Sequence, residues 1–147
     1  MERREFFVST ALGMIGLGVG GLSRAASRPG TASHANNRKI LIAGGGFRTT
    51  FLRYMVSLTG KERPKLCYLP TASADRESGI IRWYENCAPL DVVPSVQTSF
   101  ISSDRMTQTF EEVLLSVDGI VVSGGNTLNQ QAIWKAHGID KTLRTAW

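Results

Sequence analysis

Four short apolar runs, each followed by a segment with helical spacing, constrain the fold of this sequence more than any other feature. The runs cover residues 38–46, 64–73, 90–96 and 118–125. Runs of this length that stay apolar fit strands buried on both faces. Strands that alternate with helices call for a parallel sheet with right-handed crossovers and helices on both faces. The sequence therefore predicts an α/β fold.

Apolar residues at helical spacing follow each run. The stripes consist of Phe51, Met55 and Leu58 in the first helix, Ile80, Tyr84, Cys87 and Ala88 in the second, and Phe110, Val113, Leu114 and Val117 in the third. Asp75 is placed to cap the second helix. A fourth helix has Asn126 or Thr127 as its cap and Gly138 as its stop, and residues 139–147 start another. Pro94 cannot donate to a ladder, which predicts that its strand lies at an edge.

The first 35 residues have the layout of an export signal rather than of a folded segment. Arg3 and Arg4 precede a glycine-rich apolar run from Phe6 to Leu22, and this pairing resembles a twin-arginine signal. The run falls short of the ~20 strongly apolar residues of a membrane span, so a retained anchor is the weaker alternative. The small residues Ser33 and Ala35 predict cleavage after Ala35. We therefore expect export to the periplasm or the outside by the twin-arginine machinery.

Residues 36–147 are predicted to form one domain. The whole chain has 147 residues, 42% of them hydrophobic, and a net charge of +5, which fits a globular protein. Its Lys and Arg residues are scattered among acidic residues, which argues against nucleic-acid binding. The two cysteines, Cys67 and Cys87, are expected to be buried free thiols, because each lies in an apolar stretch and their spacing suits no metal.

Two glycine clusters end the first and the last apolar run, Gly44 to Gly46 and Gly124-Gly125 with Asn126. Ligands of open parallel sheets bind at the carboxyl ends of the strands, where both clusters are expected. The first cluster is not a dinucleotide-binding motif, because Thr49 stands where a third glycine is needed. It is interpreted as a tight turn, either beside a site or purely structural.

The second cluster has the more specific chemistry. Consecutive glycines let the backbone turn with positive φ and approach a ligand closely, which frees amide N–H groups to point outward. One such donor aimed at a developing oxyanion is worth roughly 3 kcal/mol in the transition state. The simpler alternative is a turn in which Asn126 only caps the following helix.

From residue 39 to 147 the sequence resembles the front half of the dipeptidase E and cyanophycinase family of serine peptidases. The stretches that carry this resemblance are ILIAGGGF, LCYLPTAS, DGIVVSGGNTLNQ and GIDKTLRTAW. The resemblance implies a fold similar to class I glutamine amidotransferases, incomplete at the C-terminus. It also implies hydrolysis of a peptide bond next to an acidic residue through an acyl-enzyme, with no metal or organic cofactor.

The same resemblance assigns roles to the glycine clusters. Gly124 and Gly125 would offer oxyanion amides, Asn126 would orient the substrate or the turn, and Gly44, Gly45 and Gly46 would shape the neighbouring loop. The family's serine elbow, glycine-x-serine-alanine-glycine, does not occur in this sequence. The nucleophile is therefore expected beyond Trp147, the sequence is interpreted as a fragment of a longer peptidase, and these 147 residues alone are expected to be inactive.

No local pair of residues is expected to replace the missing catalytic groups. Ser123 and His137 lie at opposite ends of one helix, ~15 Å or more apart. Glu111 and Glu112 are interpreted as a solvated helix face and His137 as a helix-end residue. The three tryptophans, Trp83, Trp134 and Trp147, are interpreted as core or rim packing residues, with the lining of a ligand groove as the alternative.

Two alternatives to the dipeptidase stay open. One is a cyanophycinase, which cleaves a polymer of β-linked aspartate and arginine. The triple glycine of residues 44–46 and the export signal favour it, whereas Asn126 favours the dipeptidase. The other alternative is a noncatalytic domain that binds a small ligand. The expected partner is a peptide substrate, and a homodimer is left open.

Overall fold

The structure, a computed structural model, describes residues 38–100 and 107–147. The chain separates into two units, residues 1–35 and residues 36–147, and every described residue belongs to the second. The predicted signal segment lies outside the described residues, so its role stays a prediction.

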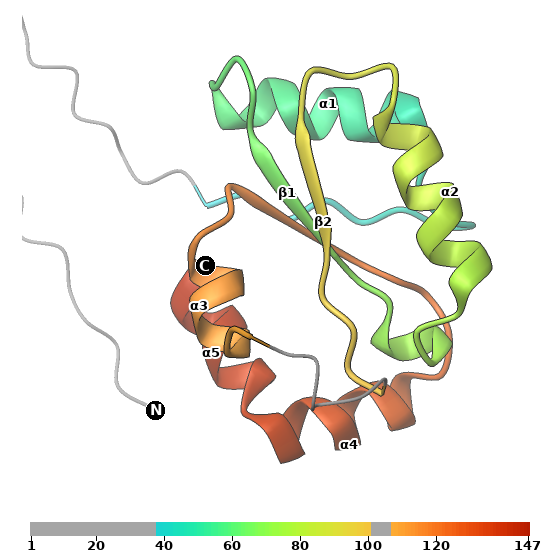
Figure 1. Cartoon of the computed structure of the whole chain (residues 1–147), viewed down its shortest axis with the longest axis vertical. Coiled ribbons are helices and arrows are strands. Elements are labelled where there is room, and N and C mark those ends of the chain that lie inside the picture. The colour runs from blue at the N-terminus through green and yellow to red at the C-terminus, as the bar shows by residue number, and fades with distance from the viewer. Residues whose placement is uncertain (1–37, 101–106) are drawn as a thin grey trace, which may run out of the picture. The chain divides into compact units, whose positions relative to one another are not determined.

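A parallel sheet of three strands forms the centre of the described unit (Figure 1). The strands are β1 (Lys65–Leu69), β2 (Val93–Val96) and β3 (Gly119–Val122), in the order β2-β1-β3. Leu66 is opposite Pro94 on one side and opposite Gly119 on the other. Since Pro94 lies in an outer strand, the prediction made from its missing N–H is confirmed.

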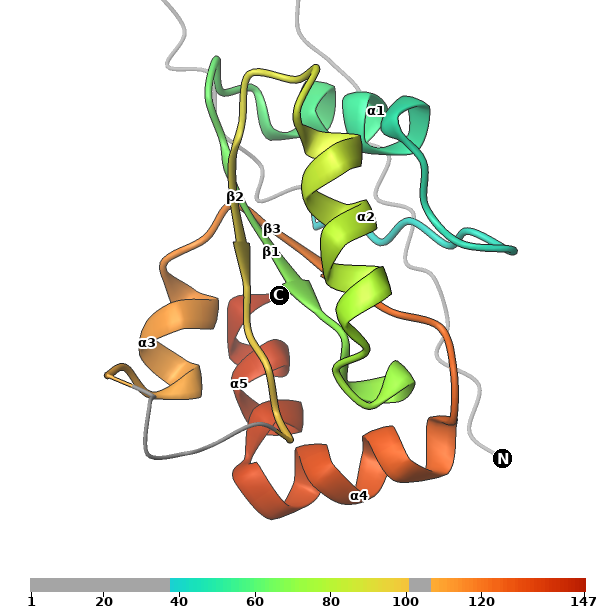
Figure 2. The same cartoon turned by 45° about the vertical axis from the view of Figure 1, so that its right-hand side comes forward.

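Helices cover both faces of this sheet, as the alternation of apolar runs predicts (Figure 2). Leu66 and Tyr68 of β1 face α1 (Thr49–Thr59) and α2 (Glu77–Cys87). Cys67 and Leu69 face the opposite way, toward α3 (Phe110–Leu115) and α5 (Ile139–Ala146). This alternation follows from the two-residue period of a strand. The remaining helix, α4 (Thr127–His137), contacts the short 3-10 helix η1 (Thr71–Ser73) that follows β1.

The prediction of a strand over residues 38–46 is wrong. This segment forms no strand in the structure, and its apolar residues Ile40 and Ile42 are 68% and 94% exposed. An extended segment becomes a strand only when its N–H and C=O groups pair with a neighbour. Strand β3 is an outer strand of the sheet, and Leu41, Ala43 and Ile120 line one open cavity, but residues 38–46 do not pair with β3.

The prediction that Asp75 caps α2 is also wrong. The residue before α2 is Arg76, whose side chain makes no capping bond, and the carboxylate of Asp75 instead accepts backbone N–H groups from Ser99 and Phe100. The buried side of α2 differs from the predicted one as well. It runs through Trp83 rather than Tyr84, which is 45% exposed, because the Trp83 ring stacks on Tyr68 of β1.

Several local predictions are confirmed. The side chain of Asn126 caps α4 by accepting from the amide of Asn129 at 3.0 Å, and Gly138 ends α4 with φ of 70°. Cys67 and Cys87 are buried free thiols, and burial raises the pKa of both, that of Cys87 to about 11. Both thiols therefore stay protonated at neutral pH.

The carboxylate of Asp118 ties the start of β3 to the start of β1. It accepts a hydrogen bond from Lys61 Nζ at 2.5 Å and another from the backbone amide of Lys65 at 2.9 Å. The amide of Asp118 in turn donates to the carbonyl of Lys65 at 2.8 Å. Burial opposes ionisation of Asp118, but the bonds from Lys61 and Lys65 prevail and lower its pKa. These bonds fix the register in which β3 enters the sheet.

We expect Asp118→Asn to lower the free energy of unfolding at neutral pH by up to about 1 kcal/mol. Because the folded-state pKa of Asp118 is depressed, the carboxylate stabilises the fold above its unfolded-state pKa. That contribution disappears as pH falls through the folded-state value. Urea unfolding of wild type and variant between pH 7 and pH 3 measures the difference, which should shrink toward acid. A difference that grows toward acid would contradict this account.

Candidate active site

The carboxyl ends of the three parallel strands meet at one edge of the sheet, where ligands of such sheets bind. Strand β1 continues into η1, β2 into residues 97–100, and β3 into the turn Ser123-Gly124-Gly125-Asn126. We call these last four residues the glycine turn. Its position at the sheet edge agrees with the expectation from sequence.

Main-chain bonds hold both ends of the glycine turn. The amide of Ser123 donates to the carbonyl of Leu69 at 2.9 Å, and the amide of Asn126 donates to the carbonyl of Ala72 at 2.8 Å. Between them, the amides of Gly124 and Gly125 donate to no group within residues 38–100 and 107–147. Within the described residues the turn therefore presents two donors without a partner, whereas the amide of Asn126 is bonded to Ala72.

The two glycines of the turn differ in their surroundings. Gly125 has a φ of 148°, and a β-carbon on it would overlap the carbonyl oxygen of Ala72. Nothing lies within 4 Å of the place where a β-carbon of Gly124 would stand. Gly125 is thus needed for close packing against η1, while Gly124 faces open space.

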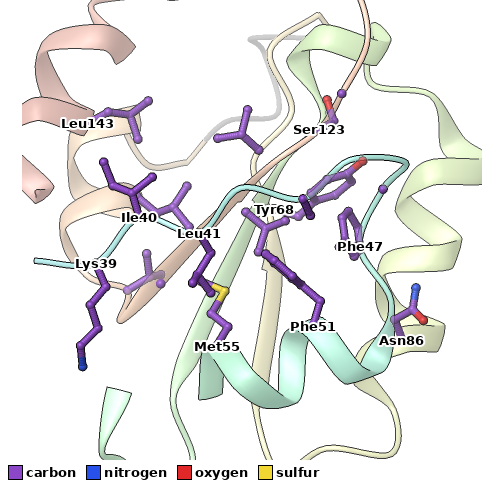
Figure 3. Close-up of a pocket in the computed structure, with 18 of the residues that line it drawn as sticks. Lys39, Ile40, Leu41, Phe47, Phe51, Met55, Tyr68, Asn86, Ser123 and Leu143 are labelled. Carbon is purple, nitrogen blue, oxygen red and sulfur yellow. The ribbon is translucent and has the colours of Figure 1, made fainter. Parts of the chain in front are cut away.

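A cavity of about 1620 Å³ opens beside the glycine turn (Figure 3). Its walls include Ser123 and Gly124 from the turn and Gly45 and Gly46 from the first glycine cluster. Gly45 and Gly46 have φ of 78° and 94°, values that other residues seldom adopt. The structure therefore brings the two predicted glycine clusters to one cavity, although Gly44, Gly125 and Asn126 are not among the residues that line it.

Basic side chains outnumber acidic ones around this cavity. The cationic residues that line it are Arg38, Lys39, Arg48, Arg76, Arg82 and Arg144, and the acidic ones are Asp118 and Asp140. Asp118 is already bonded to Lys61. Such an excess of positive charge favours an anionic ligand.

Tyr68 is a lining residue that the sequence reasoning missed as a site residue. Its ring stacks on Trp83 with centroids 5.4 Å apart and meets the edge of Phe47 at 5.2 Å. Burial raises the pKa of Tyr68 despite the neighbouring hydroxyls of Ser73 and Ser123. Figure 3 shows Tyr68 and Ser123 on the same side of the cavity. The Tyr68 hydroxyl therefore stays protonated at neutral pH.

The other residues considered from sequence lie in structural positions. His137 ends α4 and its ring lies 5.2 Å from that of Phe110, away from the cavity lined by Ser123. Glu111 and Glu112 are exposed, as expected, and Glu112 also closes a capping box with Thr109, which lowers its pKa.

The three tryptophans occupy different environments. Trp83 is fully buried in the core. The Nε1 group of Trp134 donates to Thr71 Oγ1 at 3.2 Å. Trp147 is 49% exposed, and Arg38 lies over its ring at 5.3 Å. The expectation of packing roles is confirmed for Trp83, whereas Trp134 and Trp147 also line the cavity.

Two further observations concern the described part of the chain alone. No group of three His, Cys, Asp or Glu side chains gathers there as a metal site would need. None of the helices described in residues 38–100 and 107–147 has the length and apolar character to cross a membrane.

The sheet and its two helical layers define an α/β protein, and the cavity runs along β3 from Asp118 to the glycine turn at the carboxyl end, the end at which proteins of this class bind ligands. Residues 11–147 match the model of peptidase family S51. The chain belongs to this family, which confirms the resemblance to dipeptidase E and cyanophycinase.

A curated relative agrees with this assignment. The chain is 38% identical over 115 residues to a Bacillus subtilis (strain 168) protein named "Uncharacterized peptidase YgaJ". The match covers 74% of this chain and 48% of that protein. The chain thus spans about half the length of this relative.

The two glycines of the turn provide a matched pair of variants. We expect Gly125→Ala to reduce the free energy of unfolding by about 2 kcal/mol, because the new methyl group meets the Ala72 carbonyl at a φ that L residues resist. Gly124→Ala has free space and should change it by less than about 1 kcal/mol. Urea unfolding of both variants measures this contrast. Equal effects of the two substitutions would show that Gly125 is not packed against Ala72.

Proposed function

We propose that this chain forms the oxyanion-binding side of a serine peptidase that hydrolyses peptide bonds next to acidic residues. Membership of peptidase family S51 supports the peptidase activity. The observation that carries the proposal is the glycine turn, whose unbonded amides lie at the carboxyl edge of the sheet with Gly124 on the cavity wall.

In the proposed reaction, a serine hydroxyl attacks the carbonyl carbon of the substrate and gives its proton to a general base. The carbonyl oxygen becomes an oxyanion, which the amide of Gly124 stabilises by hydrogen bonding. The carbon–nitrogen bond then breaks, the amine leaves with the proton, and water hydrolyses the resulting ester. We place the serine and its base in the part of the family domain that follows Trp147.

The charge of the cavity supports an acidic substrate. Six basic side chains line it against two acidic ones. Arg82 is close enough to Tyr68 for its charge to act on the Tyr68 hydroxyl. A substrate carboxylate near Arg82 and the Tyr68 hydroxyl would gain a charge-assisted hydrogen bond.

The same charges weigh against the cyanophycin polymer, whose arginine side chains would meet a basic wall. If the domain were noncatalytic, the same basic residues would favour binding of acidic peptides, which it would not cleave. A pocket for the polymer's arginine side chains would have to be acidic, and of the two acidic lining residues, Asp118 and Asp140, the first is paired with Lys61. An acidic dipeptide or short peptide is therefore the preferred substrate.

We further propose that the protein acts after export by the twin-arginine route. The paired Arg3 and Arg4 and the apolar run that follows them support this. The proposal places the peptidase in the periplasm or outside the cell, where it would act on peptides rather than on cytoplasmic proteins.

An assay of the complete gene product tests the activity. We expect it to release leucine from an aspartyl-leucine dipeptide, and to act at least about tenfold less efficiently on alanyl-leucine. Arg82→Gln should raise KM for the acidic dipeptide about tenfold with kcat little changed, because a ground-state charge contact is lost.

Arg53→Gln is the matched control, since Arg53 is exposed on α1 and does not line the cavity. It should leave both constants unchanged. Cleavage of cyanophycin in preference to the dipeptide would instead support the cyanophycinase alternative, and binding without turnover would support a noncatalytic domain.

A further inference from the structure

The turn around η1 contains the two described non-glycine residues with positive φ, Ala74 at 54° and Asp75 at 52°. The left-handed region is unfavourable for residues with a β-carbon and persists only where surrounding contacts hold it. Here three main-chain bonds close the turn, from Ser73 and Asp75 to the carbonyl of Pro70 and from Ala74 to the carbonyl of Thr71.

The carboxylate of Asp75 is buried at this turn, with 2% of the residue exposed. Its Oδ2 atom accepts the amides of Ser99 at 2.5 Å and Phe100 at 2.6 Å. Its Oδ1 atom is buried without a hydrogen-bond partner among the described residues. Release of the two amides would leave this buried carboxylate without any hydrogen-bond partner among the described residues, and the cost of that state opposes their release.

Thr71 connects the same turn to two more elements. Its Oγ1 atom lies 2.8 Å from Ser99 Oγ and accepts the Nε1 group of Trp134 at 3.2 Å. The turn is thereby joined to the end of β2 and to α4. We call Thr71, Asp75, Ser99 and Trp134 with their bonds the η1 clamp.

Ala72, which follows Thr71 of the η1 clamp, connects η1 to the glycine turn. Ala72, in the middle of η1, presents its carbonyl oxygen to the amide of Asn126 at 2.8 Å. The backbone of Gly125 packs so closely on that carbonyl that no β-carbon would fit. The position of the Ala72 carbonyl therefore sets where Gly125 lies and in which direction the neighbouring Gly124 amide points.

We propose that Asp75, through the η1 clamp, is a positioning residue that sets the direction of the Gly124 and Gly125 amides. Asp75 touches neither the cavity nor the amides, and it acts through Ala72 and Asn126. The catalytic consequence rests on the proposed function, whereas the positioning itself does not.

Amide hydrogen exchange of the complete gene product, followed by NMR, tests the positioning without any substrate. In Asp75→Ala the amide of Asn126 should exchange at least about tenfold faster than in wild type, because its bond to Ala72 opens locally. The amides of Cys67 and Leu69 in β1 should change by less than about twofold. Asp91→Ala is the matched control, an exposed carboxylate paired only with Arg63, and should alter none of these rates.

Thr71→Val serves as a second variant that removes the hydroxyl bonds to Ser99 and Trp134 while nearly conserving shape. This variant should also accelerate exchange of the Asn126 amide. If Asp75→Ala does not fold, Thr71→Val tests the positioning role of the η1 clamp in its place. Exchange at Asn126 that is unchanged, or that rises only as much as in β1, would overturn the proposal.

Kinetics with the aspartyl-leucine dipeptide then separate the clamp from the proposed function. If both are correct, Asp75→Ala lowers kcat about tenfold or more with KM little changed, since oxyanion donors act in the transition state. A wild-type protein without peptidase activity would refute the proposed function, while the exchange rates would still decide the role of Asp75. Altered exchange at Asn126 with an unchanged kcat would show that the clamp does not serve catalysis.

Discussion

The structure depends on strand β1, which is paired on both sides and buried on both faces. β2 and β3 take their register from it, and its side chains alternate between the two helical layers. Leu66, Cys67 and Leu69 are fully buried, so a slip of one residue would exchange the two faces and leave both cores mismatched. Because β1 has no freedom of register, the elements that follow its carboxyl end are fixed as well.

That rigidity reaches the candidate site through two short connections. β1 leads into η1, and the carbonyl of Ala72 receives the amide of Asn126 from the glycine turn. The turn is therefore placed by the sheet at one end and by η1 at the other, and the amides of Gly124 and Gly125 between them have no partner among the described residues. The proposed oxyanion donors would then be oriented before any substrate binds.

Sequence reasoning predicted the parts of this arrangement that depend on local pattern. Strands β1 and β3, the cap at Asn126 and the stop at Gly138 follow from periodicity and turn chemistry. It failed where a distant partner decides the outcome. Residues 38–46 have the apolar sequence of a strand but pair with no other strand of the described sheet. Asp75 has the residue type and position of a helix cap, but its carboxylate accepts the amides of Ser99 and Phe100 instead. Tyr68 and the η1 clamp were missed for the same reason, since nothing in the spacing places them beside the glycine turn.

In the proposed reaction the amide of Gly124 stabilises negative charge on a substrate carbonyl oxygen. A crystal structure of the complete gene product with an acidic peptide aldehyde measures this directly, because addition to the nucleophile places an oxygen where the oxyanion forms. We predict that this oxygen lies about 2.7–3.1 Å from the backbone nitrogen of Gly124. An oxygen beyond hydrogen-bond reach of Gly124, with that amide bonded instead to a main-chain carbonyl, would contradict the account.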